Sequence, residues 1–196
     1  MKNKKYTGFI IIGILVVLGI YLISTYNSLV KKEEKVNLQA NEVQNAYQRR
    51  LDLIPNIVNV VKGVSDFEQT TLEKITEARS KAASVIFSGT NASAGEFDKA
   101  TDAQNELASA TNNLIIRIEK YPTLTGTAAY SGLQTQLEGT ERRIKIARKD
   151  FNEAVNSYNS KVRTFPTKLF AGMFGFKEKT GFQSDAGAEK VIEIKF

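Results

Sequence analysis

An uncharged apolar run near the N-terminus constrains the fold of this chain more than any other feature. The run Phe9–Ile23 reads FIIIGILVVLGIYLI, and its flanks extend the apolar stretch over residues 6–26. About 20 apolar residues in a helix span the hydrocarbon core of a bilayer. The stretch therefore predicts one transmembrane helix and a single-pass membrane protein, for which the lipid bilayer is the first expected partner.

The basic N-terminus, residues 1–5, leaves two interpretations of this helix open. Lys2, Lys4 and Lys5 precede the apolar run as in a secretory signal peptide, but no small-x-small cleavage site follows it. We therefore expect an uncleaved anchor. Three lysines also follow the run shortly afterwards, so the excess of positive charge on the N-terminal side is small. It favours an N-terminus inside the cell and a soluble domain on the outer side of the membrane.

Missing residue types exclude much of enzyme chemistry. The 196 residues include no cysteine and no histidine, which removes disulfides, zinc-thiolate sites, Ser-His-Asp triads, HExxH metalloproteases and Glu-x-x-His di-iron sites. The spacing of the carboxylates specifies no acid/base pair, and Gly175–Gly181 lacks the P-loop pattern. We predict a non-enzymatic protein with no catalytic residue, no metal site and no cofactor.

Beyond the anchor, apolar residues recur at steps of three and four, the spacing of helical bundles and coiled coils. The pattern predicts a first helix that continues from the anchor to about Val64, a second over residues 65–87, a third from Ser93 and a fourth from about Ala128. Short connections favour antiparallel neighbours. We predict an all-α protein with an up-down-up-down four-helix bundle over residues 27–165.

Two arginines and a proline interrupt the apolar pattern of the first helix, in the stretch RRLDLIPN. Pro55 removes a main-chain hydrogen bond and predicts a kink. If the first and fourth helices are neighbours, Arg49 or Arg50 lies level with Glu141, because both arginines and the glutamate are roughly a dozen residues below the bundle top. We expect an ion pair that fixes the register of the two helices.

The fourth helix carries a line of polar residues beside its apolar stripe. At 100° per residue, its members fall within roughly 20° of one line along the helix; they are Glu141, Arg148, Asn152 and Asn159. The line predicts specific pairing between helices. Two interpretations stay open: the arginines, Pro55 and this line form a structural seam, or the kink and the arginines form a docking groove for a partner.

A Phe-rich segment at residues 166–177 follows the fourth helix. The apolar side chains of this segment and of the residue before it are Phe165, Leu169, Phe170, Met173, Phe174 and Phe176. Lysines lie nearby, so the composition is typical of amphipathic segments in the membrane interface. The alternative is that the rings fold back onto the lower parts of the first and fourth helices.

Residues 178–196 read as a flexible tail that ends in a strand pattern. Ile192, Ile194 and Phe196 share one side of an extended strand. A free apolar C-terminus of this kind can add a strand to a PDZ-like domain, which makes the tail a candidate site for a protein partner. A frayed end, or a strand docked on the protein itself, is the alternative.

The net charge of +6 does not by itself indicate nucleic acid, because no aromatic-basic cluster or DNA-binding motif accompanies it. Attraction to anionic lipid headgroups is the simpler explanation for an anchored chain. We expect the bilayer and another membrane or envelope protein as partners, and no nucleic acid. A homo-oligomer is left open.

Several segments resemble the LemA family in the same order and over nearly the whole chain. They are YNSLV, RRLDLIPNIVNVVKG, ARSKA, YPTL, LEGTERRIKIARKDFNEAVNSYN, FPTKLFAGMFGF and VIEIKF. The resemblance implies a bacterial single-pass protein of the inner or cell membrane with a helical-bundle domain. Family members resemble scaffolding or accessory proteins more than enzymes, and some are encoded near membrane proteases or TPM-domain proteins. Tyr47 departs from the tryptophan of many relatives, and TGTAAY departs from a Lys-Ala-Asn type of loop.

These observations lead to two expectations of function. The first is a membrane-anchored helical scaffold that engages other envelope proteins. The alternative is a membrane-surface protein whose Phe-rich segment binds or organises lipid.

Overall fold

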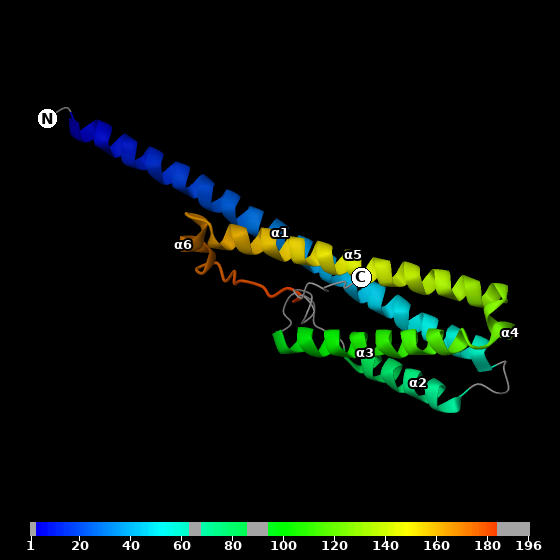
Figure 1. Ribbon diagram of the computed structural model, residues 1–196. Coiled ribbons are helices and arrows are strands. Elements are labelled where there is room, and N and C mark those ends of the chain that lie inside the picture. The colour runs from blue at the N-terminus through cyan, green and yellow to red at the C-terminus, as the bar shows by residue number, and fades with distance from the viewer. Residues whose placement is uncertain (1–2, 63–67, 86–93, 184–196) are drawn as a thin grey trace, which may run out of the picture.

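The computed structural model describes residues 3–62, 68–85 and 94–183, and every regular element in these ranges is a helix (Figure 1). The helices are α1 (Asn3–Lys62), α2 (Gln69–Ser84), α3 (Ala94–Ile118), α4 (Pro122–Thr125), α5 (Ala128–Arg163) and α6 (Thr167–Ala171). The described ranges contain no strand. The predicted all-helical class is therefore confirmed, with a long N-terminal apolar helix that packs against the other helices.

Helix α1 joins the apolar stretch to the body without a break. It is 60 residues long and continues through Pro55, which is exposed, as far as Lys62. Its N-terminal part is the one segment of the described ranges that is long and apolar enough to cross a membrane. Figure 1 shows this part projecting away from the other helices. A proline on the exposed side leaves the buried side of the helix free to pack.

The four longer helices alternate in direction, and α1 packs against α5 on one side and against the α2–α3 pair on the other (Figure 1). Buried residues on α1 recur at steps of three and four, as in a coiled coil; they include Leu29, Val36, Ala40, Val43, Tyr47, Arg50, Ile54, Ile57 and Val61. Burying each large apolar side chain contributes about 1.5–3 kcal/mol. The same spacing on α5 brings the two helices into contact along most of the body.

Helix α2 is shorter than the sequence pattern predicted. The pattern predicted a helix over residues 65–87, but Glu68 is non-helical and the helix begins at Gln69. Its C-terminal boundary is Ser84, because Val85 has extended backbone angles. The Glu68 carboxylate accepts hydrogen bonds from Arg117 of α3 and from Thr71. Glu68 therefore lies before the first turn of α2 and contacts α3.

After α5 the chain turns back at α6 and runs along α5 as an extended segment. Gly175 makes this turn with a φ of 81°, a backbone conformation that favours glycine. Two asparagines of α5 then hold the returning chain. Asn152 Nδ2 donates to Phe182 O while Phe182 N donates to Asn152 Oδ1, at 3.0 and 2.8 Å. Asn159 makes the same two bonds with Lys179, at 2.8 and 2.9 Å.

We call this pair of side chains the asparagine clamp. Its spacing has a geometric reason: seven helical residues rise about 10.5 Å, and three extended residues span about 10 Å. The clamp therefore satisfies the main chain of the returning segment in the way that a neighbouring strand would. The sequence predicted a flexible tail from residue 178, but residues 178–183 are held against α5 because side-chain amides supply the missing hydrogen bonds.

Gly181 lets the returning segment approach the clamp. A Cβ atom at this position would lie 2.6 Å from Asn152 Oδ1, closer than real contacts allow. The next ring, Phe182, packs edge-on against Phe97 and Phe151, with centroid distances of 5.2 and 5.4 Å. The segment therefore closes the hydrophobic core between α3 and α5.

We predict that Gly181→Ala lowers the free energy of unfolding by about 1–3 kcal/mol, because the added methyl group must push Asn152 away from the Phe182 main chain. The matched control is Gly139→Ala. Gly139 lies within α5 with open space around its Cα, so alanine there should stabilise the helix by about 1 kcal/mol. Thermal and urea unfolding of the two variants measure both effects, and an unchanged stability for Gly181→Ala would contradict the role of the close approach.

Candidate functional site

Arg50 occupies a core position of α1 where the spacing calls for an apolar residue. Its Nη2 donates to both carboxylate oxygens of Glu141 on α5, at 2.5 and 2.6 Å. Its Nη1 donates to the main-chain and side-chain oxygens of Gln104 on α3, at 3.0 and 3.1 Å. One guanidinium therefore connects three helices at a single level. Of the two arginines that the sequence offered for the pair with Glu141, the structure places Arg50 there and turns Arg49 outward.

This polar layer lies between two hydrophobic clusters. The cluster nearer the apolar stretch includes Tyr47 and Phe97, and the cluster nearer Lys62, at the other end of α1, includes Leu51 and Ala103. Arg50 is 3% exposed, whereas the side chain of Glu141 is 50% exposed. Desolvation therefore falls mainly on the guanidinium, and its buried Nε has no hydrogen-bond partner in the described residues. Gln104 is a polar residue within the apolar spacing of the third helix. This interruption is the sequence signal that could have identified Gln104 as a partner of Arg50.

Arg148, two turns further along the polar line than Glu141, contacts α1 and the returning segment. Its Nε donates to Tyr47 Oη at 2.8 Å, and its guanidinium lies 5.2 Å from the centroid of the Phe182 ring. Burial raises the pKa of Tyr47, and the nearby Arg148 charge partly offsets this rise. The polar line thus divides: Glu141 and Arg148 bind α1, whereas the two asparagines bind the returning segment.

Lys179 fills a second polar position that the sequence did not single out. Its Nζ lies 2.8 Å from Glu33 Oε1 of α1 and 5.3 Å from the centroid of the Tyr158 ring. The Tyr158 side chain is fully buried, and its burial together with the Glu33 charge raises the pKa of Tyr158 to about 12. The lysine therefore ties the returning segment to both α1 and α5.

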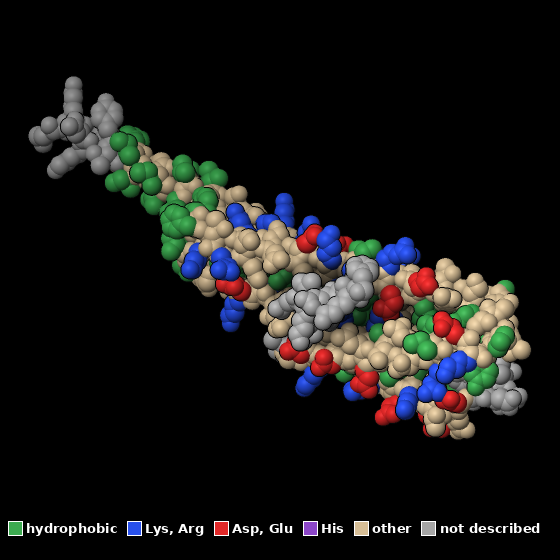
Figure 2. Space-filling model, in the orientation of Figure 1, with side chains coloured by type: hydrophobic (Ala, Val, Ile, Leu, Met, Phe, Trp, Pro, Cys, Tyr) green, Lys and Arg blue, Asp and Glu red, His purple; other side chains and the backbone are tan. Residues whose placement is uncertain are grey.

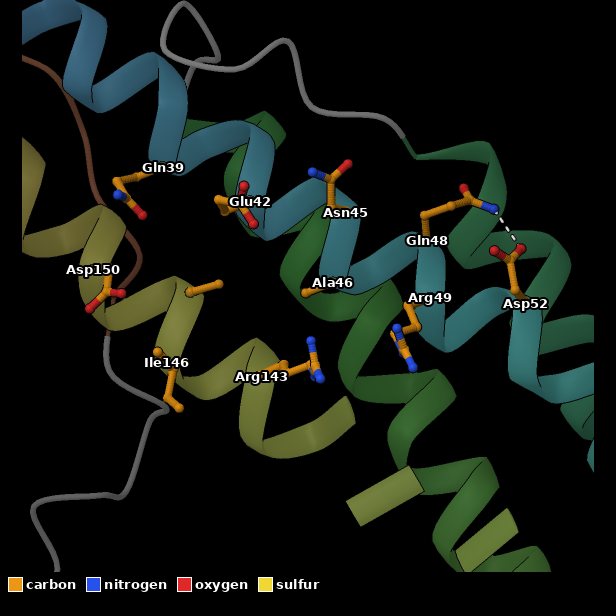
Figure 3. Close-up of a pocket in the computed structure, with 11 residues that line it drawn as sticks. Gln39, Glu42, Asn45, Ala46, Gln48, Arg49, Asp52, Arg143, Ile146 and Asp150 are labelled. Atoms are coloured by element: carbon orange, nitrogen blue, oxygen red, sulfur yellow. Dashed lines mark hydrogen bonds between the residues drawn. The ribbon is translucent and has the colours of Figure 1, made fainter. Parts of the chain in front are cut away.

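An open polar groove runs along α1 and α5 (Figure 3). Its volume is about 530 Å³, and it is lined by Gln39, Glu42, Asn45, Ala46, Gln48, Arg49, Asp52, Arg143, Ile146, Ala147 and Asp150. Figure 3 shows Arg49 and Arg143 leaning toward one another across the groove. Arg49 therefore lines the one feature that corresponds to the predicted docking groove, whereas Pro55 does not line it.

The Phe-rich segment carries exposed apolar side chains beside the end of the apolar stretch. We call Phe165, Leu169, Met173 and Phe174 the collar. Phe165 is 77% and Met173 81% exposed. Thr167 Oγ1 of α6 lies 3.5 Å from Tyr21 Oη, which places α6 level with the last turns of the apolar stretch. Figure 2 shows hydrophobic side chains gathered around the apolar stretch, while charged side chains spread over the body.

Other rings of the same segment fold back onto α1. Phe176 is buried, and its ring and that of Phe174 pack edge-on against Tyr26, with centroid distances of 5.6 and 5.4 Å. Phe170 is half-buried. The two interpretations of the Phe-rich segment thus describe different faces: one face covers α1, and the other is open.

The remaining predicted site residues lie elsewhere. Ile192, Ile194 and Phe196, the predicted partner strand, lie outside the described residues. Among residues 3–62, 68–85 and 94–183, no cluster of acidic side chains has the arrangement of a metal site.

We predict that Glu141→Ala lowers the free energy of unfolding by about 2–4 kcal/mol, because it leaves a buried guanidinium without its counter-charge. Adding Arg50→Met should recover most of this loss, because methionine keeps the apolar stem and removes the charge. Arg49→Ala, the exposed neighbour, is the control and should change stability by under about 0.5 kcal/mol. Urea unfolding of Glu141→Ala, Arg50→Met, the double variant and Arg49→Ala measures the cycle and its control. A double variant no more stable than Glu141→Ala alone would contradict the argument.

Comparisons with known proteins identify a family and several relatives of this chain. The family model described as LemA family matches residues 39–196. Protein LemA of Metamycoplasma hominis is 25% identical over 168 residues, which cover 83% of this chain and 72% of that protein. Magnetosome protein MamQ 2 of Paramagnetospirillum magneticum is 23% identical over 188 residues, covering 87% and 69%. Magnetosome protein MamQ of Magnetospirillum gryphiswaldense is 24% identical over 189 residues, covering 87% and 70%. Because the family model matches most of its length, this chain belongs to the LemA family.

Proposed function

We propose that this protein is a non-enzymatic, membrane-anchored scaffold whose four-helix bundle stands on the outer side of the membrane and engages another envelope protein. The observation that carries the proposal is the continuity of α1, which runs from the apolar stretch to the far end of the body in 60 residues. A single continuous helix fixes the position of the body relative to its anchor, whereas a flexible linker would leave that position variable.

The internal contacts of the body support the same proposal. The Arg50 layer fixes the level of three helices, and the asparagine clamp fastens the chain after α5. The polar side chains in these contacts therefore bind other parts of the same chain. The relatives carry two different names, LemA and magnetosome protein MamQ, which favours a structural unit that serves in more than one setting.

A chemical cross-linking experiment tests the scaffold. Asn113 is exposed near the end of α3, and Leu38 is exposed on α1. The natural chain has no cysteine, so Asn113→Cys or Leu38→Cys gives a unique attachment point. A membrane-impermeant thiol-amine cross-linker added to intact cells should join the body to one discrete neighbouring protein.

The control for this experiment is Leu15→Cys, which lies within the apolar stretch and should stay unlabelled in intact cells. Labelling of Asn113→Cys only after lysis would place the body inside the cell. Labelling of both body positions without any adduct would contradict the scaffold.

The collar supports a second candidate function, binding or organising lipid. Its apolar side chains are open to solvent at the level where α1 leaves the apolar stretch, and exposed Lys168 and Lys177 flank them. Apolar residues with basic neighbours at this level are typical of elements that lie in the membrane interface. In the proposed scaffold, contact between the collar and the membrane interface would also fix the orientation of the body relative to the membrane.

A tryptophan probe tests the collar, because the natural chain contains no tryptophan. We predict that Phe165→Trp in the full-length protein, reconstituted into vesicles with brominated acyl chains, shows strongly quenched and blue-shifted fluorescence. Ile116→Trp is the matched control, because Ile116 is a comparably exposed apolar residue at the far end of α3; it should show neither effect. Equal fluorescence from the two variants would place the collar outside the membrane.

A further inference from the structure

The polar groove between α1 and α5 has a charge pattern that changes sign along its length. On α1, Glu42 and Arg49 are seven residues apart; on α5, Arg143 and Asp150 are also seven apart. The two helices are antiparallel and are aligned by the contact of Arg50 with Glu141. Glu42 and Asp150 therefore lie toward the membrane end of the groove and both arginines toward the far end, as Figure 3 shows. Asp52, which accepts a hydrogen bond from Gln48, also lines the groove, beyond Arg49.

None of these four charged side chains forms an ion pair or hydrogen bond with the described part of the chain, although each lines the groove. The middle of the groove, between the two charge zones, is small and apolar. Buried Ala46 and Ala147 form its floor, and Ile146, which is 52% exposed, lines it together with exposed Asn45. Small residues at the centre allow another helix surface to come close.

We infer that this groove is the contact surface for a second copy of the same chain, in antiparallel orientation. A two-fold axis through the centre of the groove brings the acidic zone of each copy against the arginine zone of the other. Glu42 then faces Arg49 of the partner copy, and the apolar centres meet on the axis. Such a surface is self-complementary, as an isologous dimer requires.

The charge pattern decides between the two possible orientations. In a parallel pair, the membrane ends of the two grooves lie side by side, so acids face acids and arginines face arginines. Like charges in contact disfavour a complex, whereas opposite charges favour it. The antiparallel pair converts four unpartnered charges in each copy into ion pairs across the interface.

A consequence follows for the anchors, and this step rests on the proposed function. The centre of the groove lies about 20 residues beyond residue 26, or about 30 Å along α1. In an antiparallel dimer the two apolar stretches therefore point in opposite directions, and residue 26 of one copy lies about 60 Å from residue 26 of the other. Two anchored copies would join two facing bilayers at that separation.

Charge reversal tests the dimer with the full-length protein in detergent. We expect the natural chain to have the mass of a dimer by light scattering. Arg49→Glu with Arg143→Glu should weaken the dimer by about tenfold or more, because acids then face acids. Adding Glu42→Arg and Asp150→Arg reverses all four charges and restores complementarity, so the dimer should return. Unchanged thermal unfolding confirms that each variant is folded.

Two cysteine variants test the orientation. Gln39 and Asp52 line opposite ends of the groove, and they lie symmetrically about the same midpoint as Glu42 and Arg49. A mixture of Gln39→Cys and Asp52→Cys chains should form a disulfide-linked dimer under mild oxidation, whereas each variant alone should not. A parallel pair gives the opposite result and would overturn the antiparallel arrangement.

Two further outcomes would overturn the inference. A single-chain mass for the natural protein at about 100 μM, a concentration well above the dissociation constant of a specific contact, would exclude the dimer. Binding of inorganic phosphate that is lost on Arg49→Glu with Arg143→Glu, without any change in mass, would make the groove an anion site. Vesicles that carry the reconstituted full-length protein should also be joined to one another. If they are not joined while the dimer is intact in detergent, the result contradicts the proposed anchor and not the dimer.

Discussion

A buried guanidinium is the interaction on which the arrangement of this protein depends. Arg50 lies where the two hydrophobic clusters of the body meet, and it reaches α3 and α5 from α1. Apolar contacts at steps of three and four can slide by one turn with little change in buried area. A charge that finds its carboxylate at only one level makes such a slide costly. The hydrophobic clusters supply stability, and Arg50 supplies the register.

The second constraint is the exchange of a strand partner for side chains. An extended segment normally needs a neighbouring strand to satisfy its main chain. Here Asn152 and Asn159 provide both donor and acceptor to the returning segment, at a spacing that suits helix and extended chain together. The clamp lets an all-helical body fasten an extended segment beside the membrane end, which in turn positions α6 and the collar.

Much of this architecture could be predicted from the sequence. Periodicity identified α1, α3 and α5, and level counting along antiparallel helices brought Glu141 opposite the two arginines. Two features could not be predicted for physical reasons. Glu68, just before the start of α2, contacts Arg117, and the spacing of residues does not show a contact between positions so far apart in sequence. The place of residues 178–183 depends on main-chain hydrogen bonds, which do not show in the pattern of side chains.

The unbroken course of α1 through Pro55 has a mechanical consequence. From residue 26 to Lys62 the helix is about 54 Å long, and it continues from the apolar stretch without a break. Membrane helices tilt when the bilayer becomes thinner than their apolar length. In the proposed anchored state, a change in tilt of about 10° at the collar would move the far end of the body sideways by about 9 Å. Helix α1 would then convert a change in bilayer thickness into a lateral displacement of the surface that it carries.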